Sequence, residues 1–487
     1  MPDLLRFEDQ LADPDSIVRG ARDRVLGAAP FSPVDEVAVP KSSFFSRAAQ
    51  LLTLEDRVAF HAVVASVAGS AEVARAEAFV FSAARSPDPN YLLRQGVQQW
   101  LAWRNATRLA LLDGMPWMVK TDITAYFDNI QHRLLLGELE SLGASQATTR
   151  MLREMLGLWS AVPDVGIPQG PDASRLLGNI YLYPVDRKVI ERAVADGDWK
   201  YFRYMDDIRI VGKQRSDVVR GIQVLERECR LRGLTLSSQK TVLLQGDEAL
   251  SDFEDHDLAT ATYLQRSGAD TAARSELKKI LRAALKSTER IDSKRLRFSL
   301  WRLRAFRDSS GLKAVLANLE ALGPVASIVS AYLRPWLARP SVEKAITEFL
   351  FDPTRNSSPF LSTWLMASML DRPGSFPAAW SSYGRGIASD YNEPVFHRVI
   401  AANVMARSGS SSDRQWLVRE ANAEFNPQVV RGYVVALRRM AWLDRQVSQR
   451  VAGRFPELGA TLAYLRERST LPSLVYSDSS RRARVEG

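Results

Sequence analysis

The chain has 487 residues, which is too long for one hydrophobic core, so about two to four domains are expected. Its 46% hydrophobic and 25% charged residues exclude a disordered chain, and a single cysteine, Cys229, excludes a disulfide scaffold. The formal net charge of +9 favours a polyanionic partner.

The sequence gives no sign of a membrane protein. No apolar run reaches the roughly 18 residues that a membrane span needs. The first residues lack the basic and apolar regions of a signal peptide. We therefore expect a cytoplasmic protein that does not bind membranes.

The N-terminal third is expected to be mainly helical. Residues 1–30 predict one or two surface helices, and residues 58–73 and 91–112 predict two more, with Trp100 and Trp103 in the core. Between them, residues 37–41 predict an extended segment. Lys41 and Arg47 are candidate phosphate binders, although plain surface charge would explain either one taken alone.

A first acidic residue follows a predicted strand. Residues 117–121, Trp-Met-Val-Lys-Thr, predict a β-strand that ends at Asp122, and helical residues follow from Gln131. In open sheets, chemistry tends to collect at strand ends.

A turn rich in glycine and proline comes next. Gly166-Ile167-Pro168-Gln169-Gly170-Pro171 leads into a predicted helix from Ala173, with Asp172 as its expected N-cap. Such a turn lets the backbone lie close to a ligand, but a tight connection would explain it equally well.

Two adjacent acids lie in the next stretch, Tyr201-Phe202-Arg203-Tyr204-Met205-Asp206-Asp207-Ile208-Arg209-Ile210. The apolar and aromatic flanks predict a β-hairpin with Asp206 and Asp207 at its tip, and a solvated turn is the simpler alternative. If this hairpin neighbours the strand of Asp122, three carboxylates converge. They would hold two divalent cations roughly 3.5–4 Å apart, as in phosphoryl transfer.

These pieces, in this order, resemble a reverse transcriptase. The strand of Asp122 with Tyr126-Phe127-Asp128, then Ile167-Pro168-Gln169-Gly170, Tyr204-Met205-Asp206-Asp207 and the stretch 233–241 with Lys240 resemble the family's palm motifs. Pro40-Lys41, Arg47 and residues 53–57 resemble fingers motifs of the bacterial enzymes. The resemblance covers residues 39–245.

The resemblance implies a role for each matching residue. Asp122, Asp206, Asp207 and the carbonyl of Ile123 would bind the metal ions, Mg²⁺ or alternatively Mn²⁺. Phe127 would exclude ribonucleotides by a clash with the 2′-hydroxyl. The other implied roles are lining the nucleotide pocket (Gln169, Gly170), binding the triphosphate (Lys41, Arg47) and protonating pyrophosphate (Lys240).

One difference from the group II intron enzymes indicates which group of reverse transcriptases this chain resembles more. Group II intron enzymes usually carry Pro-Leu-Ser-Pro after the Gln-Gly pair, whereas this chain has Pro171-Asp172-Ala173-Ser174-Arg175. That stretch is more similar to the defence-associated and abortive-infection enzymes of bacteria. An intron maturase is therefore the weaker alternative.

A basic helix is predicted after the palm motifs. Lys and Arg recur at every fourth position from residue 274 to residue 294, and few acids oppose them. A solvated helix face is the alternative to a thumb that binds a nucleic-acid backbone. The candidate contacts are Arg274, Lys278, Arg282 and Lys286.

Residues 311–470 predict helix after helix, with a weak repeat of about 30 residues that suggests a HEAT-like stack. The tryptophans of this region are expected in its core: Trp336, Trp364, Trp380, Trp416 and Trp442. Residues 469–487 predict a flexible tail, whose Tyr476 is a remote candidate for protein priming.

The expected fold is α+β, a right-hand polymerase followed by an α-helical repeat-like domain. Its expected parts are residues 1–115 (fingers and N-terminal helices), 116–270 (palm), 271–310 (thumb) and 311–487 (C-terminal helices and tail). The expected activity is RNA-directed DNA synthesis from dNTPs, in anti-phage defence, by a homo-oligomer with an RNA template or non-coding RNA. The alternatives are template-independent or protein-primed DNA synthesis, and a catalytically silent RNA-binding scaffold.

Overall fold

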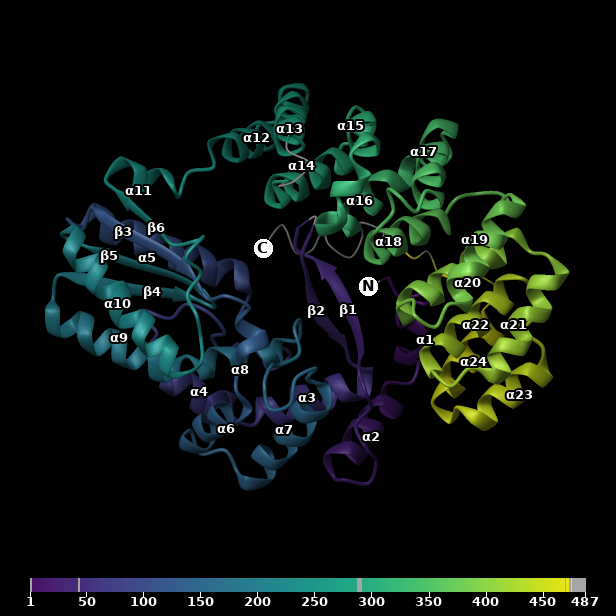
Figure 1. The fold of residues 1–487 in the computed structure, drawn as a ribbon, viewed down its shortest axis with the longest axis horizontal. Coiled ribbons are helices and arrows are strands. Elements are labelled where there is room, and N and C mark those ends of the chain that lie inside the picture. Colours follow the sequence, from purple (N-terminus) through teal and green to yellow (C-terminus); the bar gives the residue numbers. More distant parts are fainter. Residues whose placement is uncertain (1, 43, 287–290, 469, 473, 475–487) are drawn as a thin grey trace. The chain divides into compact units, whose positions relative to one another are not determined.

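A computed structural model describes residues 2–42, 44–286, 291–468, 470–472 and 474 (Figure 1). The chain divides into two compact units with separate hydrophobic cores. We call residues 17–34 and 49–255 the sheet unit, and residues 1–16, 35–48 and 256–487 the helical unit. The predicted division into fingers, palm, thumb and C-terminal domain stays a prediction.

The sheet unit is built around four antiparallel strands in the order β4-β5-β3-β6. They are β3 (Trp117–Asp122), β4 (Trp199–Tyr204), β5 (Asp207–Gly212) and β6 (Val242–Gln245). The predicted strand and the predicted hairpin are therefore both present, and β3 pairs directly with β5.

Helices cover both faces of this sheet, because alternate residues of each strand point to opposite sides. Val119, Tyr201 and Ile210 join a core with helices α9 (Tyr183–Asp196) and α10 (Arg215–Leu231). Residues one position away, such as Met118 and Phe202, pack with Trp103 of α5 (Gly96–Leu112). The strands are thus held rigidly from both sides (Figure 1).

Apart from the end of β2 (Ser46–Leu51), which pairs with β1 (Asp35–Pro40), the remaining elements of the sheet unit are helical. The predicted helix at residues 91–112 begins at Gly96, and its Trp103 is buried as expected. The others are α2 (Pro14–Val25, whose first residues belong to the helical unit), α3 (Leu54–Ala65), α4 (Ala68–Ala74), η1 (Tyr126–Asn129), α6 (His132–Ser141), α7 (Gln146–Trp159), α8 (Asp172–Tyr181) and α11 (Asp247–Ser251).

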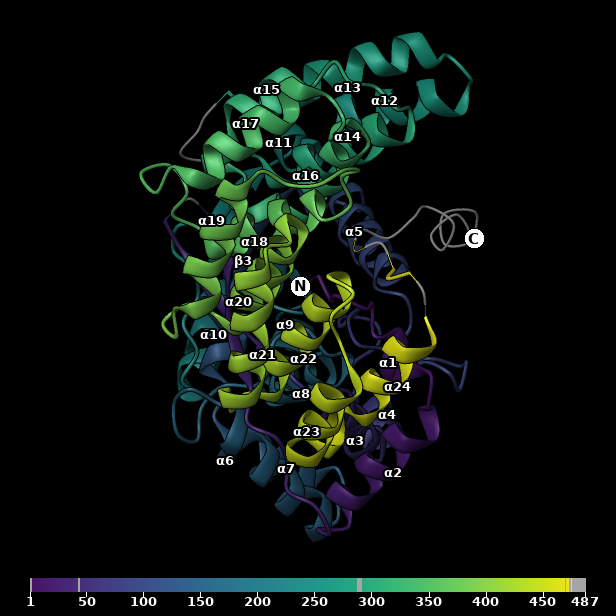
Figure 2. The same cartoon turned by 90° about the vertical axis from the view of Figure 1, so that its right-hand side faces the viewer.

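The helical unit confirms the prediction of an α-helical C-terminal part. Helices α16, α18, α20 and α22 pack in succession, each against the next (Figure 2). Short 3-10 turns join several of the helices α12 (His256–Arg266), α13 (Asp270–Ala284), α14 (Ser293–Ala305), α15 (Leu312–Ala317), α16 (Ala326–Leu333), α17 (Pro340–Phe351), α18 (Pro359–Met369), α19 (Ala378–Ser389), α20 (Val395–Ser408), α21 (Ser411–Ala423), α22 (Pro427–Arg439), α23 (Arg445–Arg454) and α24 (Gly459–Glu467).

Of the one or two surface helices predicted for residues 1–30, α2 is present with only Ile17 and Ala21 buried, but the first residues of the chain are buried instead of exposed. Leu4 and Leu5 enter the core of the helical unit, and Asp9 of α1 (Glu8–Leu11) is fully buried. The guanidinium of Arg431 donates to Asp9 at 2.8 and 2.9 Å, and the Thr461 hydroxyl donates at 2.6 Å. Hydrogen bonds from residues far along the sequence therefore offset the cost of burying the Asp9 carboxylate.

One tryptophan departs from the prediction. Trp380 and Trp416 are buried, but Trp442 is 43% exposed. It follows the end of α22, and the Arg414 guanidinium stacks over its ring at 4.8 Å. Tyr476 lies outside the described residues. No helix in the described part of the chain is both long and apolar enough to cross a bilayer.

Candidate active site

The sheet brings the three predicted carboxylates to one end. In the antiparallel register of β3 and β5, Asp122 lies opposite Asp207. Asp206 precedes Asp207 in the turn that joins β4 to β5. Residues 84 positions apart in the sequence, Asp122 and Asp206, are thereby close enough to influence each other's ionisation.

The electrostatics reflect this crowding. Burial, and then the negative charges of Asp122 and Asp207, raise the pKa of Asp206 from 3.8 to about 6. Burial and the charge of Asp122 likewise raise the pKa of Asp207. The carboxylates repel one another, so a cation placed among them would be favourable.

Lys240 places one positive charge beside these carboxylates. Its ammonium nitrogen lies 2.5 Å from Asp122 Oδ2. Two contacts hold the segment that carries it: the Ser237 amide donates to the Asp122 carbonyl at 2.8 Å, and the Thr121 and Thr241 hydroxyls are 2.7 Å apart. The predicted lysine therefore lies beside the predicted acids.

The backbone at Ile123 is also oriented by these contacts. The Asp122 carbonyl accepts from Ser237, and the Thr124 amide donates to Thr235 at 2.9 Å. In an antiparallel pair, the residue between two such bonds directs its own N–H and C=O to the other side. The Ile123 carbonyl therefore points away from residues 235–237, toward the β5 side of β3.

The donor set fits a divalent cation. Carboxylate and carbonyl oxygens are the ligands that Mg²⁺ and Mn²⁺ prefer, and the raised pKa of Asp206 shows negative charge that a cation would offset. In the described part of the chain, however, no group of three or more His, Cys, Asp or Glu side chains forms a ready-made metal site. The metal site thus stays a prediction.

A buried arginine that the sequence analysis missed supports the acidic turn. Arg203 has no exposed surface, and it donates to Asp186 at 2.8 and 2.5 Å and to Asn179 at 2.9 Å. A further hydrogen bond of 3.0 Å reaches the carbonyl of Met205. The alternation of strand residues could have revealed it, since Arg203 shares a sheet face with buried Tyr201.

The other side of the turn is fixed by Ser82. Its hydroxyl accepts from the Met205 amide at 2.9 Å and donates to Asn179 at 2.9 Å. Met205 has φ of 55°, a left-handed conformation that is strained for a residue with a side chain. The network therefore holds Met205 in this conformation immediately before Asp206.

Phe127 and Gln169 lie on neighbouring segments of the sheet unit. A Cβ built at Gly178 of α8 would lie 3.5 Å from the Phe127 ring, so the ring rests against this helix. The side-chain amide of Gln169 donates to the Asp128 carboxylate at 2.9 Å. The backbone N–H of Gln169 donates to the side-chain oxygen of Gln50 at 3.2 Å. These bonds tie the Gly-Pro turn to the segment after Asp122.

The turn enters α8 differently from the prediction. Gly170 has φ of 122°, which residues with a side chain rarely adopt. Pro171, not Asp172, occupies the N-cap position, and Asp172 instead accepts from Arg175 at 3.0 Å. The predicted cap is wrong because proline, with an extended ψ of 146°, already sets the entry into the helix.

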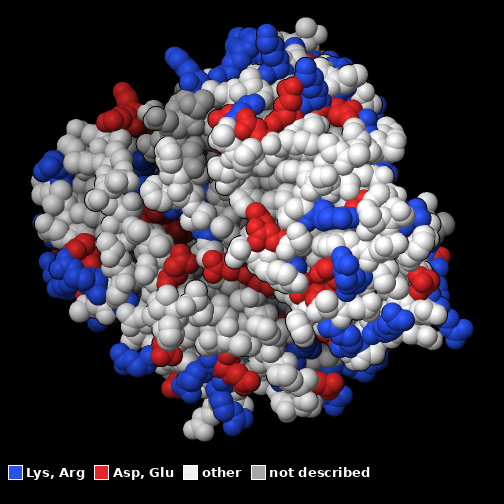
Figure 3. Space-filling model, turned by 45° about the vertical axis from the view of Figure 1, so that its right-hand side comes forward, with Lys and Arg blue, Asp and Glu red and all other residues white. Residues whose placement is uncertain are grey.

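The predicted basic helix is two helices, α13 and α14, so the expected continuous stripe to Lys294 is wrong. The Arg274 guanidinium stacks over Phe306 at 5.0 Å, and Lys278 pairs with Asp308 at 3.4 Å. Arg282 and Lys286 are exposed. Figure 3 shows Lys and Arg gathered along the upper edge of the molecule, at the height where Figure 1 places α13 and α15.

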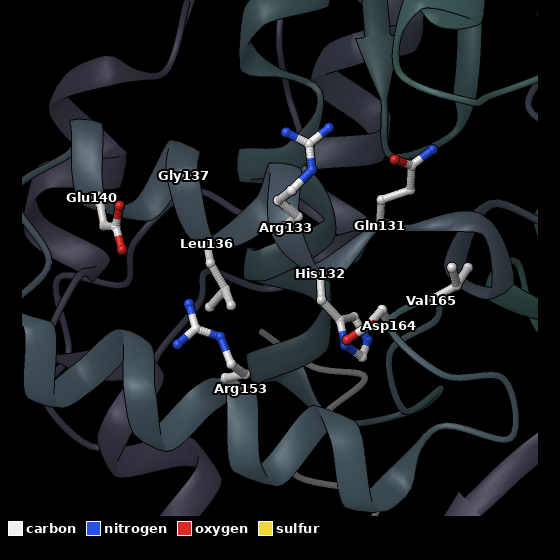
Figure 4. Close-up of a pocket in the computed structure, with 9 residues that line it drawn as sticks. All are labelled: Gln131, His132, Arg133, Leu136, Gly137, Glu140, Arg153, Asp164 and Val165. Carbon is white, nitrogen blue, oxygen red and sulfur yellow. The ribbon is translucent and has the colours of Figure 1, made fainter.

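A cavity of about 660 Å³ lies elsewhere in the sheet unit, between α6, α7 and residues 164–165. None of the three acids lines it. Figure 4 shows Arg153 of α7 reaching toward Leu136 of α6, with His132 and Asp164 near the other end. We assign it no part in the candidate chemistry.

Comparison with known families gives the class of this domain. Residues 76–269 match the sequence model of the family described as reverse transcriptase (RNA-dependent DNA polymerase). Residues 76–269 therefore form the reverse transcriptase domain that the motifs predicted.

Individual relatives are distant. An uncharacterized 91 kDa protein in the cob intron of Schizosaccharomyces pombe is 33% identical over 93 residues, which are 18% of this chain and 11% of that protein. The chain thus spans only a small part of the curated relative it matches.

The solved structures are more distant still. Telomerase from Candida albicans, in complex with a fragment of telomeric RNA, is 11% identical, with a TM-score of 0.35 over 91% of this chain and 67% of that one. Apo telomerase from Candida tropicalis is 12% identical, with the same TM-score over 91% and 70%.

Proposed function

We propose that this chain is an RNA-directed DNA polymerase that adds deoxynucleotides to a 3′-hydroxyl. The register that sets Asp122 opposite Asp207, next to Asp206, within a reverse transcriptase domain is the observation that carries the proposal. Asp122, Asp206, Asp207 and the Ile123 carbonyl bind two divalent cations, Mg²⁺ or Mn²⁺. Such ions, when bound, lower the barrier to phosphoryl transfer.

The chain's own side chains orient the reactants. Phe127 excludes the 2′-hydroxyl of a ribonucleotide, and Gln169 and Gly170 line the nucleotide pocket. Lys240 neutralises Asp122 at rest and donates a proton to the leaving pyrophosphate. Basic residues bind the phosphates of the nucleotide (Lys41, Arg47) and of the nucleic-acid backbone (Arg274, Lys278, Arg282, Lys286).

We further propose that the protein belongs to the bacterial defence-associated group and acts in the cytoplasm as a homo-oligomer with a non-coding RNA. The stretch Pro171–Arg175 after the Gln-Gly pair supports the group. The successive helices of the helical unit support a HEAT-like repeat domain. Loss of protection against phage in a strain carrying Asp206→Ala would support the defence role, whereas unchanged plaque formation with and without the wild-type protein would contradict it.

The enzymatic proposal is tested by incorporation of labelled dNTP on a primed RNA template. We expect incorporation by the wild type in Mg²⁺ or Mn²⁺, none after chelation, and a loss of about 100-fold or more in Asp206→Asn. Asp198→Asn is the matched control, since Asp198 is an exposed acid paired with Lys213 at 2.8 Å. Equal incorporation by wild type and Asp206→Asn would refute the proposal.

The same assay separates the alternatives. Sequencing the product distinguishes copying of the template from random or homopolymeric synthesis. A product covalently attached to protein would indicate protein priming, for which Tyr476 is the candidate. RNA binding without incorporation on any template would instead indicate a catalytically silent scaffold.

A further inference from the structure

Three polar side chains of the helical unit are linked by hydrogen bonds that the proposed polymerase does not use. The Ser362 hydroxyl of α18 lies 3.1 Å from Nε2 of His397, on α20. Nδ1 of the same imidazole lies 2.7 Å from the carboxylate of Glu393, four positions earlier in the chain. Because α18 packs against α20, Ser362 and His397 meet although they are 35 positions apart in the sequence.

The chemistry of the three groups sets the direction of these hydrogen bonds. An ionised carboxylate only accepts, so Glu393 holds the imidazole proton on Nδ1 of His397. Nε2 is then an acceptor, and it faces the Ser362 hydroxyl. A hydroxyl, an imidazole and a carboxylate linked in this order form the arrangement that activates a serine for nucleophilic attack.

A cavity of about 410 Å³ adjoins the three groups, and Ser362, His397 and Glu393 all line it. Ser362 is 1% exposed and His397 is 4% exposed, so the cavity is the route by which a ligand would reach them. Its other walls are mainly apolar or aromatic: Leu350, Phe351, Pro353, Pro359, Tyr383 and Ile387. A space of this size and character suits a small molecule with an apolar group.

Two further polar side chains surround the serine. The Tyr383 hydroxyl and the Asn356 amide nitrogen each lie 3.4 Å from Ser362 Oγ. Burial raises the pKa of Tyr383, so this hydroxyl keeps the proton that it can donate. Donors beside a nucleophile stabilise the negative charge that develops on a carbonyl oxygen under attack.

We propose that Ser362, His397 and Glu393 form a serine hydrolase site for small carboxylic esters with an apolar acyl group. This activity is separate from the proposed polymerase function. Ser362 and His397 are the catalytic residues. Glu393 is a positioning residue, because it orients the imidazole and stabilises its positive charge without contacting the ester.

The reaction has two steps. Ser362 Oγ attacks the carbonyl carbon while His397 Nε2 takes the hydroxyl proton. The bond from that carbon to the alcohol oxygen breaks, and His397 gives its proton to the leaving alcohol. In the second step water attacks the acylated serine and gives a proton to His397, which passes it to Ser362 Oγ as the carboxylic acid leaves.

A network that only joins α18 to α20 is the alternative, and two observations favour chemistry. Asn356 Oδ1 is buried and has no hydrogen-bond partner among the described residues, although buried polar atoms are normally paired. The space next to Ser362 is also left open, whereas protein interiors are normally filled by side chains. Both features are expected of a site that receives a ligand.

A fluorophosphonate probe tests the nucleophile, because an activated serine hydroxyl displaces its fluoride and becomes covalently labelled. We expect the full-length wild type to be labelled, Ser362→Ala to lose the label, and His397→Gln to be labelled about 100-fold more slowly. The matched control is Ser357→Ala, since Ser357 is an exposed serine that lines the same cavity. Equal labelling of Ser362→Ala and wild type would overturn the proposal.

Fragmentation mass spectrometry of the labelled wild type locates the phosphonate and needs no variant. Attachment to Ser362 would support the proposal even if Ser362→Ala failed to fold. Attachment only to other serines, or no attachment to the folded chain, would leave the hydrogen bonds with a structural role and overturn the proposal.

Hydrolysis of p-nitrophenyl butyrate tests the role of Glu393. We expect Glu393→Gln to lower kcat about 100-fold or more, because the amide can donate to Nδ1 and favour the wrong tautomer of His397. KM should stay within about twofold, since Glu393 is not assigned a contact with the ester. An unchanged kcat would contradict the assigned role.

Discussion

At the scale of single residues, the candidate site is defined by negative charge that the described residues around it do not fully balance. Lys240 contacts Asp122, but burial and two neighbouring carboxylates still raise the pKa of Asp206 to about 6. Uncompensated acids at the end of a rigid sheet cost stability. Their presence is understandable if they bind a cation during function.

This charge predicts a pH-dependent stability. Because the pKa of Asp206 is raised on folding, the protonated form favours the folded state, and stability is lost as pH rises from about 4 to about 6. In metal-free protein at pH 8, Asp206→Asn should therefore increase the free energy of unfolding by up to about 3 kcal/mol. Its Tm should rise accordingly. The gain should disappear near pH 4, as measured by thermal unfolding.

The control for this prediction is again Asp198→Asn. Asp198 and Lys213 form an exposed pair, and such pairs contribute less than about 1 kcal/mol. A lower Tm of Asp206→Asn at pH 8 would mean that the carboxylates do not repel one another as described.

At the scale of elements, the β4–β5 hairpin depends on the buried ion pair beneath it. Arg203→Ala would leave Asp186 buried without its partner, at a cost of about 3–5 kcal/mol. Chemical denaturation should show this loss. Arg203→Lys should recover only part of it, because lysine cannot make the forked contacts with Asp186 and Asn179.

An exposed arginine provides the comparison. Arg192 pairs with Asp196 at 3.0 Å and is 55% exposed, so Arg192→Ala should change stability by less than about 1 kcal/mol. If Arg203→Ala cost no more than Arg192→Ala, the network would not be the support of the turn.

The packing of α10 on the sheet depends on one glycine. A Cβ at Gly221 would lie 2.8 Å from the Ile210 side chain and 2.9 Å from the Trp199 ring. We expect Gly221→Ala to lower the unfolding free energy by about 1–3 kcal/mol, despite the higher helix propensity of alanine.

Its matched control is Gly157→Ala in α7. A Cβ there meets nothing within 4 Å, so the substitution should stabilise the protein by about 0.5–1 kcal/mol. Denaturant titration of both variants tests the contrast, and equal effects would contradict a close approach of α10 to the sheet.

The sequence predicted those elements whose pattern is local. The strand ending at Asp122 and the hairpin around Asp206 follow from alternating residues and turn chemistry, and the structure has both. The role of Arg203 was not predictable from local pattern alone, because its partners Asp186 and Asn179 lie on other elements. Arg274 likewise belongs to a shorter helix than the spacing of charges suggested.

At the scale of the whole molecule, two separate cores predict two unfolding events. The core of the sheet unit and that of the helical unit share no residue. Calorimetry of the full chain should therefore show two transitions. Gly221→Ala should shift one, and Asp9→Asn, which weakens the contact with Arg431, should shift the other. A single transition that moves in both variants would contradict independent cores.

The burial of Asp9 against Arg431 also concerns how the protein is made on the ribosome. The two residues are 422 positions apart. At about 5–20 residues per second, Asp9 would wait roughly 20–80 s after its own synthesis until Arg431 is translated. Throughout that interval Leu4 and Leu5 lack the packing surface they have in the finished protein. These exposed apolar side chains, next to acidic residues, would form a segment that chaperones are suited to bind. Residues 49–255 would have time to fold before the last helices are synthesised.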